Sequence, residues 1–220
     1  MGGGRREGSG AIALIDYGAG NLTSVRKGLG AAGAEFFTPD RPVDLARAAG
    51  IVVPGVGHFA ATRRIEENWR QAILLALRRG VPLLGICLGL QYLFEGSDEA
   101  PDLTGLGLLA GRCTRLPSTV KVPHVGWNGL RIVRPSRLLD GIAGGSQVYF
   151  THSYAAPVTA DCAAAAEHGA AFAAVVEREN VFGVQFHPEK SGDTGLRVLR
   201  SFVQITKFPN SQISKCSQGA

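Results

Sequence analysis

Apolar residues along this chain fall into short runs that alternate with segments of helical spacing. Runs of strand length occupy residues 11–16, 34–37, 50–53 and 81–86, and helical spacing covers 22–32, 43–49 and 59–79. Asn21 is a predicted N-cap, Gly33 and Gly80 are predicted to end the helices before them, and a break is expected near Asn68. Strands alternating with helices predict a parallel sheet covered on both faces.

The pattern changes after Gly96. Short β-like runs at 111–116, 130–133, 148–154 and 171–177 are separated by turns, and a further strand is predicted at 181–186. A closing helix is predicted over 191–206, with Leu196, Leu199, Phe202 and Val203 on one face. The expected fold is therefore α/β, an open and mostly parallel sheet flanked by helices, with some antiparallel strands in the C-terminal half.

Neither an internal repeat nor a linker interrupts the pattern. We expect one domain over residues 11–207, between flexible tails at 1–10 and 208–220. The first ten residues are Gly-rich and lack the apolar segment of a signal peptide. The longest apolar runs are far below the ~20 residues of a membrane span, so no membrane association is expected.

The charge and cysteine patterns narrow the function classes. The net charge of +5 is scattered, and the densest basic cluster, at residues 63–79, lacks interleaved aromatic residues, so it predicts a solvated helix face and no nucleic-acid partner. The cysteines at 87, 113, 162 and 216 show neither metal-ligand spacing nor a sign of secretion, which favours a reducing cytoplasm. His58 and His124 are not spaced with acidic residues, so no metal is expected. The glycine-rich stretches at 18–20 and 54–57 lack the nucleotide-binding fingerprints, so no cofactor is expected.

A sharp turn is predicted between the fourth strand and the next helix. Cys87 stands at this turn between Gly85 and Gly89, in the pattern of a nucleophile elbow. The glycines let neighbouring backbone approach closely, and the helix N-terminus favours the reactive thiolate. The alternative is a small buried cysteine at a strand end, which is a common role for this residue.

A candidate base follows a hundred residues later. His187 and Glu189 stand two residues apart, and Pro188 between them favours an extended conformation at His187. Residues i and i+2 of an extended segment project to the same side. His187 can therefore take the thiol proton while Glu189 orients the imidazole. The alternative is a solvated loop histidine beside a surface glutamate.

Together the stretches G-I-C-L-G-L-Q (85–91) and G-V-Q-F-H-P-E (183–189) resemble the triad signature of the class I glutamine amidotransferases. One branch, the glutaminase subunits of imidazole glycerol phosphate synthase in histidine biosynthesis, is resembled by four further stretches: I-D-Y-G-A-G-N-L (15–22), V-P-G-V-G-H-F (53–59), V-P-H-V-G-W-N (122–128) and Y-F-T-H-S-Y (149–154). The resemblance covers roughly residues 11–207.

The resemblance implies hydrolysis of L-glutamine to glutamate and ammonia by Cys87, His187 and Glu189. Ammonia would pass to a cyclase partner, in a heterodimer, that makes imidazole glycerol phosphate and an aminoimidazole carboxamide ribotide. A glutaminase subunit of another pathway, such as vitamin B6 synthesis, is the alternative with the same triad. A catalytically silent interaction subunit and a cysteine peptidase are more distant alternatives.

The remaining site residues follow from the elbow geometry and the resemblance. An oxyanion hole needs N–H donors. The elbow geometry offers Leu88, and the resemblance adds the loop Gly55-Val56-Gly57, which is otherwise an ordinary turn. The resemblance also implies substrate contacts at Gln91, Glu99, His152, Ser153 and Tyr154, and a partner interface at Trp127 and Asn128. From composition alone Gln91 could equally lie on the surface, and Trp127 could fill the core.

Overall fold

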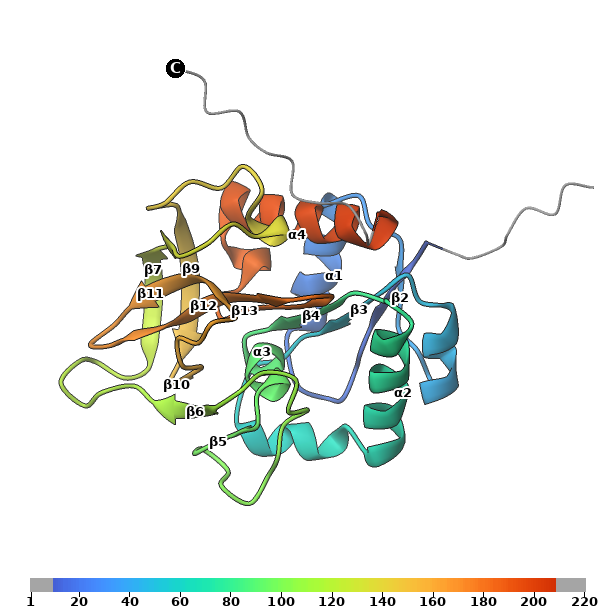
Figure 1. The fold of residues 1–220 in the computed structure, drawn as a ribbon, viewed down its shortest axis with the longest axis horizontal. Helices are drawn as coiled ribbons and strands as arrows, with labels where there is room; N and C mark the ends of the chain where they lie inside the picture. Colours follow the sequence, from blue (N-terminus) through green and yellow to red (C-terminus); the bar gives the residue numbers. More distant parts are fainter. Residues whose placement is uncertain (1–9, 209–220) are drawn as a thin grey trace, which may run out of the picture.

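A computed structural model describes residues 10–208 (Figure 1), so the predicted tails lie outside the described residues except for Gly10 and Phe208. The main sheet has the strand order β2-β1-β3-β4-β13-β12-β11-β8. Its strands are β1 (Ile12–Leu14), β2 (Phe36–Phe37), β3 (Gly50–Val53), β4 (Leu83–Ile86), β8 (Arg131–Ile132), β11 (Cys162–Glu167), β12 (Ala171–Arg178) and β13 (Val181–Val184).

Pairing within this sheet changes direction once. The pairs from β2 to β13 are parallel, and those from β13 to β8 are antiparallel. The predicted mostly parallel sheet with antiparallel strands in the C-terminal half is confirmed.

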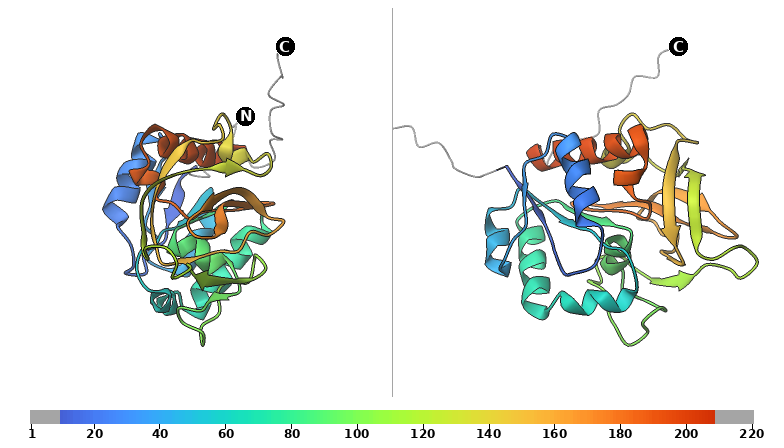
Figure 2. Two further views of the ribbon diagram at one scale, coloured as in Figure 1. Left: turned by 90° about the vertical axis from the view of Figure 1, so that its left-hand side faces the viewer. Right: turned by 180° about the vertical axis from the view of Figure 1, so that it is seen from behind.

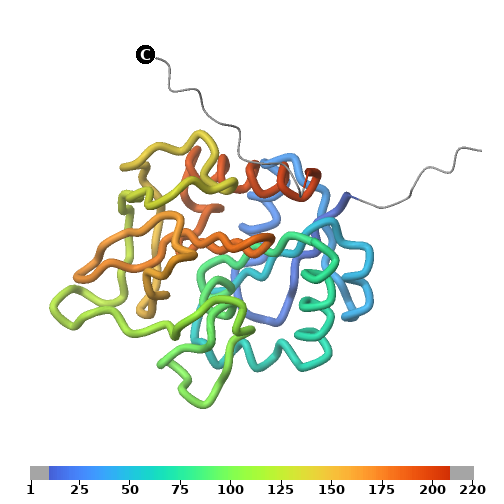
Figure 3. Tube along the Cα trace, viewed as in Figure 1, coloured from blue at the N-terminus to red at the C-terminus, as the bar shows by residue number. Residues whose placement is uncertain are grey.

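Two smaller sheets lie beside the main one (Figure 2), and the path of the chain through them can be followed by colour in the Cα trace (Figure 3). The first contains β5 (Gly96–Ser97), β6 (Arg112–Arg115) and β10 (Tyr154–Ala155), and the second pairs β7 (His124–Gly129) with β9 (Gln147–His152) in antiparallel register. The β7–β9 pair stands at one end of the molecule, crossing the direction of the main strands.

Helices cover both faces of the main sheet and close a separate apolar core on each (Figure 1). One face carries α1 (Leu22–Ala31) and α4 (Gly192–Lys207), and the other carries α2 (Glu67–Arg78), α3 (Leu88–Leu93) and the 3-10 turn η2 (Phe59–Arg64). In β1, Ile12 packs with the α1–α4 core and Ala13 with the opposite one, because successive strand residues point to opposite faces. The 3-10 turns η1 (Pro42–Arg47), η3 (Arg137–Leu139) and η4 (Pro188–Lys190) complete the connections.

Most predicted helix ends are confirmed. The Asn21 side chain accepts a hydrogen bond from Ser24 N at 3.2 Å, and Gly33 and Gly80 have φ values of +78° and +84°. The segment 59–79 is broken, but its break lies at 65–66, slightly before the predicted Asn68. The predicted helix at 43–49 is the short 3-10 turn η1.

Three strands, β5, β7 and β11, escaped the sequence prediction. Strand β11 is alanine-rich and gains its conformation from β8 and β12, which flank it on both sides, so tertiary context overrides a weak intrinsic preference. In α4, Leu199, Phe202 and Val203 are buried as predicted, whereas Leu196 is half-buried and Val198 takes its place in the core.

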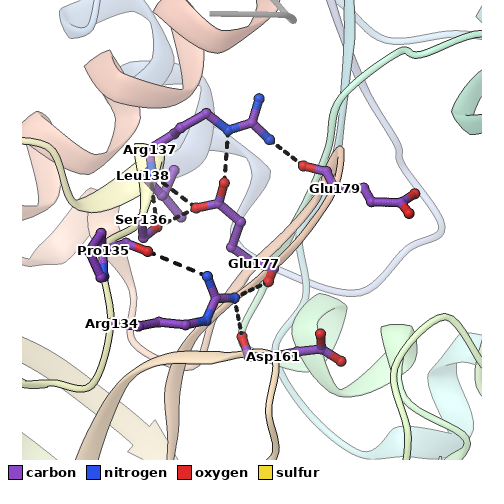
Figure 4. Close-up of polar contacts among 8 residues, drawn as sticks. All are labelled: Arg134, Pro135, Ser136, Arg137, Leu138, Asp161, Glu177 and Glu179. Carbon is purple, nitrogen blue, oxygen red and sulfur yellow. Dashed lines mark hydrogen bonds and ion pairs between the residues drawn. The ribbon is translucent and has the colours of Figure 1, made fainter. Parts of the chain in front are cut away.

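A buried carboxylate ties η3 to the sheet (Figure 4). Glu177, at the end of β12, accepts hydrogen bonds from Ser136 Oγ at 2.5 Å and from Arg137 N and Nε at 2.9 and 2.8 Å. Arg134 and Arg137 also donate to the backbone carbonyls of Glu177 and Glu179. Since Glu177 pairs with Phe182 near the start of β13, this cluster braces the opposite end of that strand from His187.

The elbow brings backbone against backbone. A Cβ atom on Gly89 would overlap the carbonyl oxygen of Val53, and one on Gly85 would meet the backbone of Gly89. Only glycine at these two positions lets β3, β4 and α3 lie this close together.

We therefore expect Gly89→Ala to lower the free energy of unfolding by about 1–3 kcal/mol or more, because the rigid Val53 carbonyl cannot yield. Gly30→Ala is the matched control: Gly30 is exposed in α1 with open space around its Cα, and the change should stabilise by about 0.5–1 kcal/mol. Urea denaturation of both variants measures the difference. Equal, small effects would show that the close approach is not a constraint.

Candidate active site

Three adjacent parallel strands bring the predicted residues to one edge of the sheet. The glycine-rich loop follows β3, Cys87 follows β4, and His187 lies three residues beyond β13. The register pairs Ile86 with Val184, and Cys87 N donates to Val184 O at 2.7 Å. Residues from distant parts of the sequence therefore meet at the carboxyl ends of the strands, where open α/β sheets bind ligands.

Cys87 occupies a strained turn between β4 and α3. Its φ is +51°, and within residues 10–208 the only other non-glycine residue with positive φ is Glu179. Such backbone costs about 1–3 kcal/mol and persists only where the surroundings enforce it. Cys87 is 5% exposed, so the turn holds it at the border of a cavity rather than in open solvent.

His187 and Glu189 form a buried pair. His187 Nδ1 lies 2.8 Å from Glu189 Oε1, and each side chain is 2% exposed. Burial alone would lower the pKa of His187, but the neighbouring Cys87 sulfur and the hydrogen bond to Glu189 outweigh it and raise the pKa to about 9. The ring therefore holds a second proton at neutral pH, on the nitrogen that Glu189 does not contact. This arrangement differs from the solvated loop histidine that the sequence also allowed.

A cavity of about 250 Å³ opens beside Cys87. Its volume is below the roughly 300–1,000 Å³ of drug-sized pockets, which fits a small substrate. All five predicted substrate residues line it: Gln91, Glu99, His152, Ser153 and Tyr154. Gly57 and Leu88 of the predicted oxyanion hole line it too. Gly55 and Val56 do not line it.

The glycine-rich loop accepts a hydrogen bond from one of the predicted oxyanion donors. Leu88 N donates to the carbonyl of Gly55 at 3.4 Å, so a carbonyl oxygen points where an oxyanion would need N–H groups. Behind the loop, Tyr17 Oη donates to Pro54 O at 2.8 Å, and a Cβ on Gly55 would overlap this hydroxyl. In this conformation the Leu88 N–H, one of the predicted oxyanion donors, is therefore occupied by the loop.

The predicted interface residues lie outside the cavity, on β7. Trp127 is 56% exposed and meets Tyr149 edge to face at 6.0 Å, which excludes the core-filling alternative. Asn128 Nδ2 donates to Glu167 O at 2.8 Å. With Val125, which is 57% exposed, Trp127 gives this end of the molecule an apolar surface.

Comparisons with known proteins agree with this geometry. The family model described as glutamine amidotransferase class-I matches residues 13–205. The chain is 46% identical over 200 residues to imidazole glycerol phosphate synthase subunit HisH of Moorella thermoacetica, covering 89% of this chain and 95% of that one. It is 51% identical over 201 residues to the HisH subunit of Gloeobacter violaceus, covering 88% of each. This chain belongs to the HisH branch of the class I glutamine amidotransferases.

Solved structures support the amidotransferase fold. A crystal structure of glutamine amidotransferase superposes with a TM-score of 0.71 over 90% of this chain and 99% of that one, at 18% identity. Within residues 10–208 no helix is long and apolar enough to cross a membrane. The same residues contain no cluster of His, Cys, Asp and Glu side chains that could hold a metal ion.

A chain of neutral rings joins β7 to the cavity of this amidotransferase. His152 Nδ1 lies 3.0 Å from Tyr154 O, which can only accept, so Nδ1 carries the proton. His152 Nε2 then accepts from His124 Nδ1 at 3.2 Å, and His124 Nε2 faces Asn128 Nδ2 at 3.5 Å. Burial is the main cause that lowers the pKa of His124 to about 4 and of His152 to about 3, so both rings are uncharged at neutral pH.

Two residues at the nucleophile escaped the sequence prediction, Gln185 and Thr151. Gln185 Nε2 lies 3.6 Å from Cys87 Sγ, and Thr151 O lies 4.0 Å from the same sulfur. A signal for Gln185 was present, because it precedes His187 by two residues and shares its side of the extended segment. No sequence signal marks the carbonyl of Thr151.

Acid should destabilise the amidotransferase through His124 and His152. Both pKa values are lower in the folded state than the ~6.5 of an unfolded histidine, so the unfolded state binds more protons as the pH falls. The free energy of unfolding is therefore highest above pH 6.5, where both histidines are neutral in either state, and it falls toward pH 4. We expect about 2 kcal/mol less free energy of unfolding per histidine at pH 4.5 than at pH 7.

Urea denaturation at the two pH values measures this loss. The double variant His124→Asn/His152→Gln should lose less stability on acidification than the wild type, with the exposed His58→Gln as control. An unchanged pH dependence in the double variant would contradict the assignment.

Proposed function

We propose that this chain is the glutaminase subunit of an imidazole glycerol phosphate synthase in histidine biosynthesis. It hydrolyses L-glutamine to L-glutamate and ammonia, and passes the ammonia to a cyclase partner in a heterodimer. The observation that supports this most is the meeting of Cys87 with the buried His187–Glu189 pair beside a small polar cavity, in a chain closely related to HisH subunits.

The reaction is an acyl transfer through Cys87. The thiolate sulfur attacks the side-chain amide carbon of glutamine, and the carbonyl becomes a tetrahedral oxyanion. His187, which holds a proton at neutral pH, gives that proton to the amide nitrogen, and ammonia leaves as the thioester forms. His187 then takes a proton from water, the resulting hydroxide attacks the thioester carbon, and glutamate leaves with the thiolate restored.

Glu189 orients His187 and stabilises its charged form. The 2.8 Å contact to Nδ1 fixes which nitrogen faces the reaction. Because Cys87 must remain a free thiol, a reducing compartment is required, and we assign the protein to the cytoplasm.

The cavity residues bind the amino-acid end of glutamine. Glu99 uses Oε2 to accept from Phe59 N at 2.7 Å, and its carboxylate can pair with the α-ammonium group. Gln91 Nε2 donates to Tyr154 O and to Gln185 Oε1. The side-chain oxygen of Gln91 is left to accept a hydrogen bond from the substrate. His152 and Ser153 form the facing wall.

The cyclase partner docks on the exposed apolar surface at Trp127 and Val125. Free ammonia becomes protonated in water and is then no nucleophile, so direct transfer to the partner's site avoids its loss. The partner with its ribotide ligand also completes the oxyanion hole, by favouring a turned Gly55–Val56 peptide whose N–H replaces the Gly55 carbonyl opposite Leu88.

We expect Cys87→Ala to abolish glutamine hydrolysis, because no other group can form the thioester. His187→Ala should lower turnover by about 10²–10⁴-fold, the usual contribution of a general base, and Glu189→Gln should cost less. Glutamate release by the heterodimer is the measurement, with Cys162→Ala as a control on β11. The Cys87→Ala complex should still use added ammonium salts; substantial glutaminase activity in it would refute the covalent mechanism.

We expect the isolated chain to be a poor glutaminase, because a missing oxyanion donor costs about 10²–10³ in turnover. Glutamate release should rise by this factor in the complex with the ribotide. Gly57→Ala should reduce the ratio of turnover between the ligand-bound complex and the isolated chain, because Gly57 has φ +106° with open space around it, and an alanine strains this closed loop through its backbone alone.

Trp127→Ala should weaken the stimulation of glutamate release by the partner while leaving the turnover of the isolated chain unchanged. Rates that agree within a few-fold among chain, complex and ligand-bound complex would overturn the model of a closed oxyanion hole.

A further inference from the structure

Gln185 is a buried amide placed directly against the nucleophile. It follows β13, is 0% exposed, and its Nε2 lies 3.6 Å from Cys87 Sγ, which is hydrogen-bond distance for a sulfur acceptor. Burying an amide costs free energy unless both its ends are bonded. The other end is bonded too, since Oε1 of Gln185 accepts from Gln91 Nε2 at 3.3 Å.

The network decides which end of the Gln185 amide faces the sulfur. Carboxamide nitrogen and oxygen are distinguished by their partners. Gln91 faces the backbone carbonyl of Tyr154 at 2.8 Å, which can only accept, so Gln91 presents its nitrogen there. The second N–H of Gln91 then requires an oxygen on Gln185, and the nitrogen of Gln185 is left facing Cys87.

We propose that Gln185 is a further catalytic residue, whose side-chain N–H stabilises the thiolate of Cys87 during glutamine hydrolysis; this rests on the proposed function. A hydrogen bond to an anion is about twice as strong as one between neutral groups. The donor therefore favours the thiolate over the thiol, both before attack and when the thioester breaks down.

Gln185 and His187 have complementary tasks at the same sulfur. They lie two residues apart on one extended segment, and both approach the end of β4. His187 exchanges protons with the reacting atoms, whereas an amide N–H neither takes nor gives a proton at neutral pH. Gln185 therefore supplies a constant donor that persists when His187 has given up its proton to the leaving ammonia.

The arrangement also links nucleophile and substrate cavity. One hydrogen-bonded line runs from the Tyr154 carbonyl through Gln91 to Gln185 and then to Cys87. Since Gln91 lines the cavity, the residue proposed to hold glutamine also fixes the amide that supports the thiolate.

Replacing Gln185 by methionine tests the proposal, because methionine keeps the length of the side chain and removes the donor. Iodoacetamide labelling of Cys87 is followed by mass spectrometry of its peptide as a function of pH. In Gln185→Met the half-maximal labelling rate should move up by about one pH unit, the size expected for a lost charge-assisted hydrogen bond. In the heterodimer kcat should fall about tenfold at neutral pH with KM little changed.

Gln185→Glu is the second variant, since it keeps the shape and places a carboxylate beside the sulfur. Its labelling midpoint should rise further than that of Gln185→Met, and it carries the test if the methionine variant does not fold. Thr206→Val, a buried polar change in α4, is the control and should label as the wild type does.

Labelling midpoints within about 0.3 pH unit of the wild type in the folded variants would overturn the proposal, as would an activity loss that lies in KM alone. Failure of the proposed function would look different. The wild-type heterodimer would then release no glutamate, whatever the labelling profiles show.

Discussion

The pairing of β4 with β13 is the interaction on which the site depends. Cys87 and His187 stand a hundred residues apart, and the register Ile86 to Val184, extended by the hydrogen bond from Cys87 N to Val184 O, sets them side by side. A slip of one residue would turn every side chain to the other face of the sheet. The glycines of the elbow then allow α3 to press against β3, which holds the strained turn in place.

The glycine-rich loop after β3 lacks the same rigidity. Cys87, His187 and Glu189 are buried and tied to strands, whereas the loop after β3 is held by single hydrogen bonds, from Tyr17 to Pro54 and from Leu88 to Gly55. Turning one glycine peptide costs little compared with moving a strand. In the function we propose, the nucleophile can therefore stay fixed while a turn of this loop alone changes the stabilisation of negative charge beside it.

The sequence predicts well what local patterning controls and poorly what distant contacts control. Strand β3 was predicted with its observed bounds because it is a short apolar run buried on both faces. The meeting of Cys87, His187 and Glu189 could be predicted because each of the two motifs carries its own turn signals. Strand β11 was missed because alanine favours no strand by itself. The direction of the Gly55 carbonyl was beyond reach, since it depends on Leu88 and on Tyr17, 37 residues before Pro54.

The β7–β9 pair connects two surfaces of the molecule. In its register Trp127 lies opposite Tyr149, and His124 lies opposite His152. Tyr149 O receives the backbone N–H of His187 at 2.9 Å, while His152 borders the cavity. One pair of strands therefore connects the exposed side of β7 both to the backbone of His187 and to the border of the cavity, without passing through the main sheet.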